Sequence, residues 1–370
     1  MKSKRVSAFV GIVVVLLVGA ILFGCGSSRH LSISKFLYVA NFASANVSAY
    51  TINAATGALT EVSGSPFAAG TNAEFLAATP SASFLYVGNR GAGTISGYSI
   101  NATTGALTEL SDSPFTAGAG ASSIAIDPTG KFLYVANNSD GNLSAFTINA
   151  TTGALTEIAG SPYTTGTCAW VTVVDPTGKF VYSSNACDDA VSGFSINATT
   201  GALTPIAGQP FSTGIDPESI AVDPTGKFLC VANYEDETIS VFSINPTTGV
   251  LTEVADSPFA LVAGSSPEGI AVDATGKFVY TANTGNATIS AFAINATTGA
   301  LTEVSGSPFL AGNGPFNLTS DHSGKFAFAT FSDDNEVGST TINQTTGALG
   351  TGTSVPAGSN PTGLAVAGLQ

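Results

Sequence analysis

The sequence predicts an all-β fold, a seven-bladed β-propeller, because one segment recurs seven times and each copy contains four short strand-like runs. The repeat is clearest in the segment TTGAL and its close variants, whose glycine lies at positions 57, 105, 153, 201, 249, 299 and 347. Successive copies are 48 residues apart, except for one step of 50. A period near 50 residues is typical of propellers and solenoids, in which each copy forms one structural unit.

The third copy shows where the four antiparallel strands of a blade are expected, namely at residues 123–127, 131–137, 142–149 and 154–160. These runs are apolar or alternate in polarity, and Gly, Pro or Asn residues bound them. The turn DPTGK contains a proline that presets φ and a glycine suited to the left-handed conformation. The turn NATTG combines Asn and Gly for the same reason. Each copy is therefore expected to form one antiparallel sheet.

The two ends of the chain predict how the ring closes. The first copy, residues 35–62, begins with its second strand, and no segment similar to SIAID precedes it. The C-terminal segment PTGLAVA at 361–367 instead matches PEGIAVD at 267–273. We therefore expect residues 362–367 to form the innermost strand of the blade that holds residues 35–62. A closed ring removes exposed sheet edges, and it makes residues 35–370 a single domain.

The turns and loops are expected to divide between two faces of the ring. The DPTGK and NATTG turns lie on one side, which we call the bottom face, and the remaining loops lie on the other, the top face. The bottom turns are nearly the same in every copy, whereas the top loops differ. Variable loops on a constant scaffold are where binding usually resides. The top face is therefore where we expect a functional site.

Charge is unevenly distributed between these faces. The chain has a formal net charge of −14, which would repel a phosphate backbone and excludes nucleic acid as a partner. Arg90 is the only clear base expected on the top face. The acidic residues expected there are Glu74, Asp140, Asp188, Asp189, Asp216, Glu218, Glu235, Asp236, Glu237, Glu268, Asp333, Asp334 and Glu336.

The N-terminus predicts export. Residues 1–24 combine a basic start, MKSKR, with a long apolar run that carries no charge. This run ends in LFGC followed by GSS, which resembles the lipobox of bacterial lipoproteins. Cys25 is therefore the expected lipidation site, and residues 25–34 are the expected tether to the membrane. An uncleaved membrane anchor and an ordinary secretory signal are the alternatives. All three place the domain outside the cytoplasm, in the periplasm or on the cell surface.

The repeats resemble those of a known family. Segments such as KFLYVAN, LSAFTINATTGALTE and IAIDPTG are similar to the lactonase-type seven-bladed propellers, which include 6-phosphogluconolactonases and a muconate-lactonising enzyme. They are also similar to the YVTN repeats of surface-layer propellers. The resemblance extends over about residues 33–370. It implies a seven-bladed propeller and, for the enzymes of the family, lactone hydrolysis by His, Arg and Glu side chains on the channel face.

The candidate site is the top mouth of the central channel. The position that opens each innermost strand is occupied in turn by Glu74, Ser122, Trp170, Glu218, Glu268, Phe316 and Thr362. The channel mouth would then contain three carboxylates, an indole and a phenyl ring, which can bind a cation or stack on a sugar. The alternative is that these residues line a water-filled pore that binds nothing specific. With loop residues added, the expected ligand-binding residues are Glu74, Arg90, Trp170, Asp188, Asp189, Glu218, Glu268 and Phe316.

The catalytic residues of the family cannot be placed one by one on this sequence. Opening a lactone needs a base to activate water and a positive group for the developing oxyanion. His30 follows the predicted lipidation site, and His322 replaces the proline of a bottom turn. Arg5 and Arg29 lie in the predicted signal and tether, which leaves Arg90. The acidic mouth would also repel a phosphorylated lactone, so the sequence alone leaves it open whether the protein is an enzyme.

Two top loops suggest a metal as a further alternative. The segments NNSDGN and FSDDNE supply carboxylate and amide oxygens of the kind that calcium binds. Neither has the full spacing of a known calcium loop. We therefore expect no cofactor, with a divalent cation as the open alternative.

Two cysteines are expected to form a disulfide on the top face. Cys168 lies just before an innermost strand, and Cys187 lies just after the second strand of the same blade. Both are the same distance from the intervening hairpin turn to within about one residue, which places them opposite each other. Export to an oxidising compartment favours their oxidation.

Three functions are compatible with these observations. We favour an extracytoplasmic, lipid-anchored, monomeric binding module whose acidic top face contacts a cell-envelope protein, a glycan or a cation. The alternative is a lactone hydrolase similar to 6-phosphogluconolactonase. In that case Glu218 and Glu268 would have to carry the reaction, since no other catalytic set is found. The third is a structural envelope protein without a site.

Overall fold

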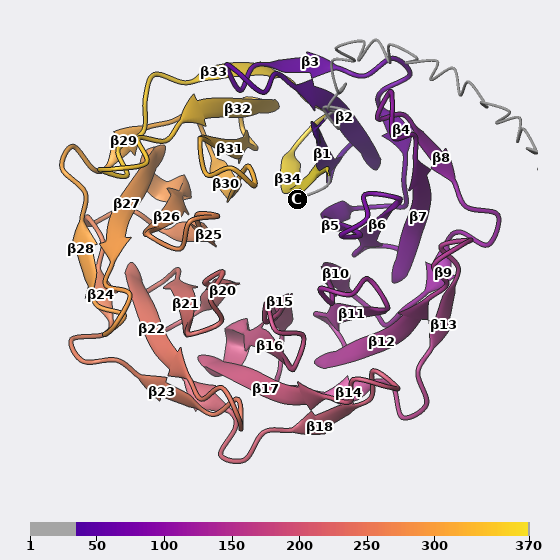
Figure 1. The fold of residues 1–370 in the computed structure, drawn as a ribbon, viewed down its shortest axis with the longest axis horizontal. Coiled ribbons are helices and arrows are strands. Elements are labelled where there is room, and N and C mark those ends of the chain that lie inside the picture. Colours follow the sequence, from indigo (N-terminus) through magenta and orange to yellow (C-terminus); the bar gives the residue numbers. More distant parts are fainter. Residues whose placement is uncertain (1–34, 369–370) are drawn as a thin grey trace, which may run out of the picture. The chain divides into compact units, whose positions relative to one another are not determined.

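The computed structural model describes residues 35–368, which form seven small antiparallel sheets arranged in a ring (Figure 1). Each sheet is one blade of a propeller, and its innermost strand lies next to the ring axis. This arrangement confirms the predicted all-β, seven-bladed fold. The predicted signal peptide, Cys25 and the tether lie outside the described residues.

The first four blades follow the chain from its N-terminal side. Blade 1 contains β34 (Pro361–Ala367), β1 (Lys35–Asn41), β2 (Asn46–Ile52), β3 (Leu59–Glu61) and β4 (Phe67–Ala68). Blade 2 contains β5 (Ala73–Ala78), β6 (Phe84–Asn89), β7 (Thr94–Ile100), β8 (Leu107–Glu109) and β9 (Phe115–Thr116). Blade 3 contains β10 (Ala121–Ile126), β11 (Phe132–Asn137), β12 (Asn142–Ile148), β13 (Leu155–Glu157) and β14 (Tyr163–Thr164). Blade 4 contains β15 (Ala169–Val174), β16 (Phe180–Asn185), β17 (Ala190–Ile196), β18 (Leu203–Pro205) and β19 (Phe211–Ser212).

The remaining three blades complete the ring. Blade 5 contains β20 (Pro217–Val222), β21 (Phe228–Asn233), β22 (Thr238–Ile244), β23 (Leu251–Glu253) and β24 (Phe259–Ala260). Blade 6 contains β25 (Pro267–Val272), β26 (Phe278–Asn283), β27 (Thr288–Ile294), β28 (Leu301–Glu303) and β29 (Phe309–Leu310). Blade 7 contains β30 (Pro315–Ser320), β31 (Phe326–Phe331), β32 (Glu336–Thr341) and β33 (Thr353–Pro356).

The only helices among the described residues are two short 3-10 turns in top loops. They are η1 (Ala186–Asp188) in blade 4 and η2 (Thr284–Asn286) in blade 6. Over the part of the chain that the structure describes, no helix is long and apolar enough to cross a membrane.

The outer edge of a blade differs from the single fourth strand that the repeat predicts. In blades 1 to 6, two short strands lie end to end at this position, and both pair with the third strand. In blade 3, for example, Phe146 of β12 pairs with Glu157 of β13, and Leu143 pairs with Tyr163 of β14. Only blade 7 has one outer strand, β33.

The bottom turns are held by a buried aspartate. The carboxylate of Asp127 accepts hydrogen bonds from the backbone N–H groups of Thr129 at 3.0 Å, Lys131 at 2.7 Å and Phe132 at 2.7 Å. The equivalent aspartates in blades 4 to 7 make the same backbone contacts. The aspartate of DPTGK therefore stabilises the turn through backbone donors, which explains why the turn varies so little.

Tyrosines connect neighbouring blades. The Tyr38 hydroxyl donates to the Gly105 carbonyl of blade 2 at 2.8 Å, and Tyr86, Tyr134, Tyr182 and Tyr280 make the corresponding bond to their next blade. Gly105 has φ +76°, and a Cβ atom there would lie 2.4 Å from the Phe36 ring. The glycine of TTGAL is thus needed both for the turn and for close packing between blades.

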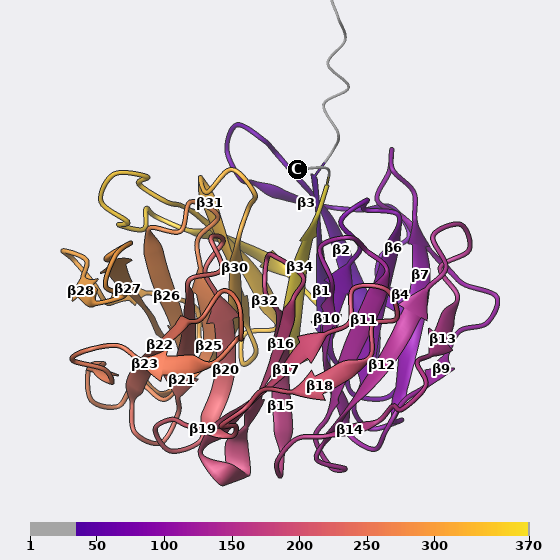
Figure 2. The ribbon, with the colours of Figure 1, turned by 60° about the horizontal axis from the view of Figure 1, so that its bottom comes forward.

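The C-terminal strand closes the ring as predicted. β34 pairs antiparallel with β1, with Phe36 opposite Ala367 and Val39 opposite Leu364. Figures 1 and 2 show these two strands side by side, although they come from opposite ends of the described chain. Blade 1 therefore receives its innermost strand from the C-terminus.

Deleting residues 361–370 is expected to destabilise the whole domain, because it removes the innermost strand of blade 1 and exposes the edge of β1. Thermal unfolding should show a melting temperature lower by about four degrees or more, if this loss costs about 3 kcal/mol or more in a domain of this size. A deletion of residues 369–370 alone leaves β34 whole and serves as the control. Equal melting temperatures for the two deletions would contradict the role assigned to this strand.

Candidate functional site

The candidate site lies where the top ends of the innermost strands converge on the ring axis. Each innermost strand has a register shift at its top end. In β5, Ala73 pairs with Asn89 and Leu76 pairs with Val87, so Glu74 and Phe75 together oppose one residue. A bulge of this kind changes the direction of a side chain, and bulges are frequent beside active sites. The shift falls on the position that the repeat comparison singled out.

Arg90 connects two of the predicted site residues. Its Nη1 lies 3.5 Å from Oε1 of Glu74, and its guanidinium carbon lies 4.5 Å from the centre of the Trp170 ring. Glu74 belongs to blade 2 and Trp170 to blade 4, while the side chain of Arg90 is 35% exposed. The guanidinium is therefore held by a carboxylate and an aromatic face, and it remains accessible to a ligand.

Two further carboxylates come from adjacent blades. Glu218 lies on β20 and Glu268 on β25, and both are partly buried. Burial raises the pKa of Glu218 to about 9, and the negative charges of Glu268, Asp216 and Glu74 add to this rise, while Arg90 opposes it. Burial, followed by the charge of Asp216, raises the pKa of Glu268 to about 7. The two carboxyls are thus expected to differ in protonation near neutral pH.

Glu74 is the most deeply buried of the three carboxylates. Burial raises its pKa to about 7; Arg90 opposes the rise and Glu268 adds to it. The Oε2 atoms of Glu74 and Glu218 are buried and have no hydrogen-bond partner among the described residues. A buried polar atom without a partner costs free energy. These two atoms therefore have unused hydrogen-bonding capacity next to the channel. We call Glu74, Arg90, Trp170, Glu218 and Glu268 the mouth cluster.

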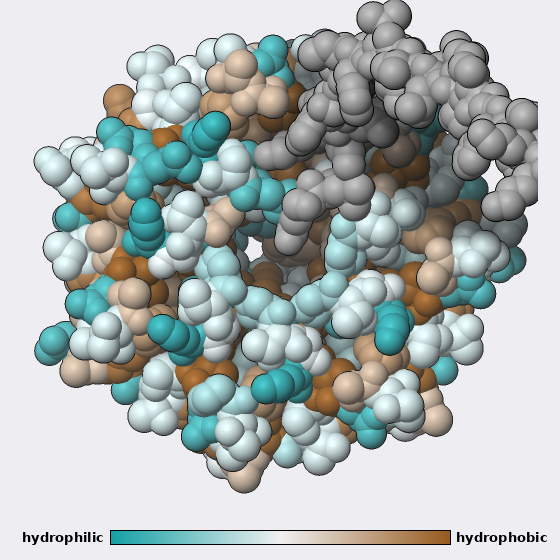
Figure 3. Space-filling view, viewed as in Figure 1, coloured by the Kyte–Doolittle hydropathy of each residue, from teal (hydrophilic) through white to brown (hydrophobic). Residues whose placement is uncertain are grey.

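Aromatic rings lie beside the mouth cluster. Phe75 of β5 and Phe316 of β30 have ring centres 6.3 Å apart. Phe75 also packs with Trp170 against a cluster of blades 4 and 5 that includes Val171 and Ile220, so it reaches across the ring. The space-filling view shows the opposite, bottom face of the ring, which also has an opening at its centre (Figure 3). The mouth thus combines charged groups with apolar ring faces.

Two of the seven aligned positions support the scaffold. The Ser122 hydroxyl donates to the Trp170 carbonyl at 2.9 Å, and the Thr362 hydroxyl donates to the Glu74 carbonyl at 2.7 Å. Both side chains are buried. They tie neighbouring innermost strands together and so position the residues that bear the charges.

The top loop of blade 4 holds the remaining predicted residues. Cys168 and Cys187 form a disulfide with their Cα atoms 5.4 Å apart. The Asp188 carboxylate accepts a bond from the Thr167 N–H at 2.6 Å, and Asp189 accepts one from the Asp216 N–H at 2.9 Å. Both aspartates therefore have their hydrogen-bond partners in the top loops of blades 4 and 5.

Asp216 and Phe75 lie at the site, although neither is among the ligand-binding residues expected from the sequence. Asp216 raises the pKa of Glu218 and Glu268 through its charge, and its own pKa is raised, first by burial. Phe75 follows Glu74 directly, and a bulge allows two consecutive residues to approach the same region. The signal that would have found Phe75 is the bulge, which the repeat does not reveal.

A metal has little support from the side chains. Among residues 35–368, no group of three or more His, Cys, Asp or Glu side chains has the proximity needed to hold a metal ion. The carboxylates of the mouth interact through charge, but they are not arranged as a coordination shell. The divalent cation stays a prediction of the sequence alone.

The family of this chain follows from its match to a family model. The model described as "Lactonase, 7-bladed beta-propeller" matches residues 23–173, 172–261 and 258–366. The chain belongs to the seven-bladed lactonase family. Membership in this lactonase family agrees with the resemblance found in the repeats. No curated protein matches the sequence significantly.

Several solved structures have the same fold as this lactonase-family chain. One, from Bacteroides fragilis and provisionally named a 6-phosphogluconolactonase, has a TM-score of 0.80 and 22% identity and covers 91% of this chain and 99% of its own. The periplasmic gluconolactonase of Pseudomonas aeruginosa has a TM-score of 0.76 and 19% identity, with coverages of 90% and 99%. At sequence identities of 22% and 19%, this structural similarity establishes a common fold.

The raised pKa values predict how stability depends on pH. A glutamate in the unfolded chain ionises near pH 4.5, whereas Glu218 in the folded chain ionises near pH 9. The folded state therefore binds more protons between these values, and its stability falls as the pH rises, by about 1.4 kcal/mol per pH unit for one proton of difference. Glu218→Gln should reduce this fall between pH 6 and pH 9.

The measurement is the free energy of unfolding in denaturant at several pH values, compared between the native protein and the variant. Glu157→Gln, at an exposed position of an outer strand, serves as the matched control and should leave the pH dependence unchanged. An equal pH dependence in the Glu218→Gln variant and the native protein would show that this carboxyl is hydrated rather than buried.

Proposed function

We propose that the protein hydrolyses an uncharged sugar lactone at the mouth cluster. The observation that carries this proposal is the pairing of a single accessible guanidinium with carboxyls that ionise at different pH values. Membership in the lactonase family supports the reaction class. The name of the Pseudomonas neighbour, a periplasmic gluconolactonase, agrees with an unphosphorylated substrate.

Each step of the reaction has a candidate group. Glu268, with a pKa of about 7, is suited to take a proton from water as the water oxygen attacks the lactone carbonyl carbon. Arg90 is positioned to stabilise the negative charge that develops on the carbonyl oxygen. Glu218, which is protonated at neutral pH because its pKa is about 9, can donate a proton to the ring oxygen as the C–O bond breaks. The product is the open-chain hydroxy acid.

The charge of the mouth favours a neutral substrate. Arg90 is the only arginine among residues 35–368, and Glu74 already lies 3.5 Å from it. Three glutamates and Asp216 lie around the same region. A phosphate group would add two negative charges to this environment and would be repelled. The aromatic rings of Trp170 and Phe316 can instead pack against a sugar ring.

The binding module favoured by the sequence remains the second candidate. The same acidic mouth, with buried carboxylate oxygens that have no partner, can hold a cation or a glycan without turnover. In that case the protein would act on the cell envelope through binding alone. The assay below separates the two candidates, because only the enzyme opens a lactone.

Hydrolysis of D-glucono-1,5-lactone should exceed the spontaneous rate, as followed by acid release at constant pH. Glu268→Gln and Arg90→Met should each lower kcat/KM by about 100-fold or more, the usual contribution of a general base or an oxyanion donor. The pH profile should rise near pH 7 and fall near pH 9. The 6-phosphorylated lactone should react at least tenfold more slowly.

The control for this assay is Glu157→Gln on the outer strand of blade 3, which should retain full activity. Hydrolysis no faster than the spontaneous rate would refute the enzyme and leave the binding module. Faster hydrolysis of the phosphorylated lactone would show that the proposed substrate charge is wrong.

We also propose that the protein is exported and lipid-anchored through Cys25, as the N-terminal sequence suggests. Cells that express it should incorporate a radiolabelled or clickable fatty acid into the protein, and Cys25→Ala should abolish this labelling. Cys230→Ala, at a buried free cysteine of the propeller, is the matched control. Unmodified native protein in the soluble fraction would contradict the anchor.

A further inference from the structure

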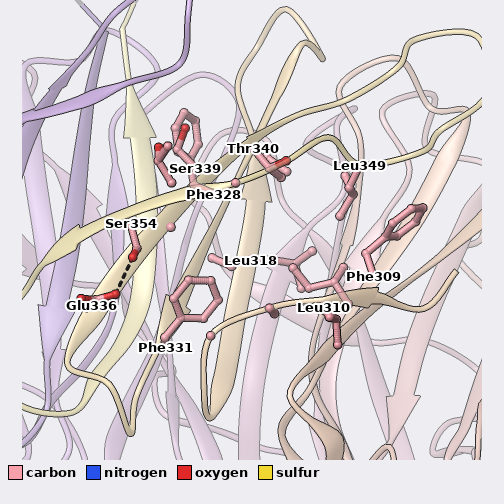
Figure 4. A pocket seen from close by; sticks show the side chains of 18 of the residues that line it. Phe309, Leu310, Leu318, Phe328, Phe331, Glu336, Ser339, Thr340, Leu349 and Ser354 are labelled. Carbon is pink, nitrogen blue, oxygen red and sulfur yellow. Dashed lines mark hydrogen bonds between the residues drawn. The ribbon is translucent and has the colours of Figure 1, made fainter. Parts of the chain in front are cut away.

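Blade 7 differs from the other six blades, and a cavity of about 520 Å³ lies between it and blade 6. This volume is in the range of sites for small molecules. Its walls come from the outer part of both blades, and they include Phe309, Leu310, Phe331, Thr340 and Leu349 (Figure 4). Its lining residues lie on the second, third and outer strands and their loops, apart from Leu318 on the innermost strand β30, and none of them belongs to the mouth cluster.

The cavity arises where a large cross-strand pair is replaced by a small one. In blade 7, Ala327 of β31 lies opposite Thr340 of β32. In every other blade, the same pair joins a leucine or valine to a tyrosine or phenylalanine. These pairs are Leu37–Tyr50, Leu85–Tyr98, Leu133–Phe146, Val181–Phe194, Leu229–Phe242 and Val279–Phe292.

The complete blades show what belongs in this space. Tyr50 of blade 1 packs against Phe328, Val337 and Val355 of blade 7, which is the preceding blade in the ring. Its hydroxyl donates to the Pro356 carbonyl at 2.6 Å, and the Tyr98 hydroxyl donates to the corresponding Ala68 carbonyl of blade 1. An aromatic ring on the third strand therefore fills the gap to the preceding blade and can bond a carbonyl of its outer strand.

Blade 6 presents the equivalent apolar surface to Thr340 of blade 7, but no aromatic side chain of blade 7 packs on it. Ile289 pairs with Phe309 in blade 6 just as Val337 pairs with Val355 in blade 7. Leu310 corresponds to Ala68 and Pro356, and it is 93% exposed. No side chain among residues 35–368 donates a hydrogen bond to the Leu310 carbonyl. Blade 6 thus offers the same apolar surface and acceptor that a tyrosine uses elsewhere.

A second replacement makes the cavity more aromatic. In six blades an asparagine at the end of the second strand donates to a serine of the third strand, as Asn283 does to Ser290 at 2.8 Å. Blade 7 has Phe331 and Gly338 at these positions, and a Cβ atom on Gly338 would lie 2.4 Å from the Phe331 ring. The polar pair is thus replaced by a phenyl ring that lines the cavity, and this ring is a surface on which another ring can pack.

The charges at the rim select against anions. No basic side chain is among the lining residues, whereas Asp334 and Glu336 are. The Ser354 hydroxyl donates to the Glu336 carboxylate (Figure 4), and the Asn313 N–H donates to Asp334 at 2.7 Å. Both carboxylates already have partners within the protein, so they form an acidic rim rather than a cation site.

From these observations we propose that the cavity between blades 6 and 7 is a binding site for an uncharged, single-ring aromatic molecule, in particular a phenol. The ring takes the place that a tyrosine or phenylalanine side chain occupies in the other six blades. The phenol hydroxyl donates to the Leu310 carbonyl, as the tyrosine hydroxyls do at the equivalent carbonyls. The proposal is independent of the lactonase activity, because the site shares no residue with the mouth cluster.

The test uses 4-fluorophenol as the probe and follows its binding to the full chain by ¹⁹F NMR. We expect saturable binding to the native protein and at least tenfold weaker binding of 4-fluorobenzoate, which is anionic. Thr340→Phe and Ala327→Leu restore the residues of the other blades, and each should weaken 4-fluorophenol binding at least tenfold. Both variants fill a cavity, and a cooperative thermal unfolding transition serves as the check that they are folded.

A matched control makes the same chemical change outside the cavity. Thr252→Phe, at an exposed position of β23 in blade 5, should retain the affinity of the native protein. Absence of saturable 4-fluorophenol binding to the native protein would overturn the proposal. Unchanged affinity in both filled variants would overturn it as well, because the ring would then be bound elsewhere.

Discussion

The pairing of β34 with β1 is the interaction on which the rest of the structure depends. It supplies blade 1 with its innermost strand and places the C-terminal segment between β30 and β5. The Thr362 hydroxyl then donates to the Glu74 carbonyl, and the Thr330 hydroxyl donates to the Thr362 carbonyl at 2.8 Å. Gly363 allows this approach, since a Cβ atom there would lie 2.5 Å from the Glu74 carbonyl oxygen. Ring closure and the position of the first carboxylate of the mouth are therefore one structural feature.

Closure also explains which positions are free to differ. Seven blades meet at a common axis only if their turns and interblade contacts are nearly equal, so the buried aspartates and tyrosines recur. The residues at the bulges carry no such constraint, and there the chain places Glu74, Trp170, Glu218, Glu268 and Phe316. Tight convergence of the innermost strands buries these carboxyls, and this burial is the first cause of their raised pKa values. The scaffold thus provides the electrostatic environment, and the exceptions to the repeat provide the chemistry.

The sequence predicted the scaffold better than the site. The repeat period, the missing first strand and the match of PTGLAVA were sufficient for the seven blades and their closure, because these features follow from local patterns and counting. The second short outer strand was not predicted, since in blade 3 it consists of only Tyr163 and Thr164, beyond the predicted run 154–160, and two residues are too few to show a strand pattern. Glu74, Glu218 and Glu268 were found by alignment of the copies. The contact of Arg90 with Trp170 was not found, because it joins blades 2 and 4 across the ring and depends on the bulges.

The interfaces between neighbouring blades, which we call seams, differ in their packing. This difference determines where the folded ring is expected to open locally. The seam between blades 7 and 1 joins the two ends of the chain, yet it has the Tyr50 hydroxyl on Pro356 and the Ser339 hydroxyl on Gly57 at 2.8 Å. The seam between blades 6 and 7 is covalently continuous, but it lacks the ring that six other blades have at Thr340. Removing a buried aromatic or leucine side chain typically costs about 2–5 kcal/mol. Local opening should therefore begin between blades 6 and 7, where packing is weakest, rather than where the chain ends meet. A molecule that fills this gap would stabilise the folded ring in proportion to its occupancy, so that the least stable seam is also the one whose stability a ligand can change.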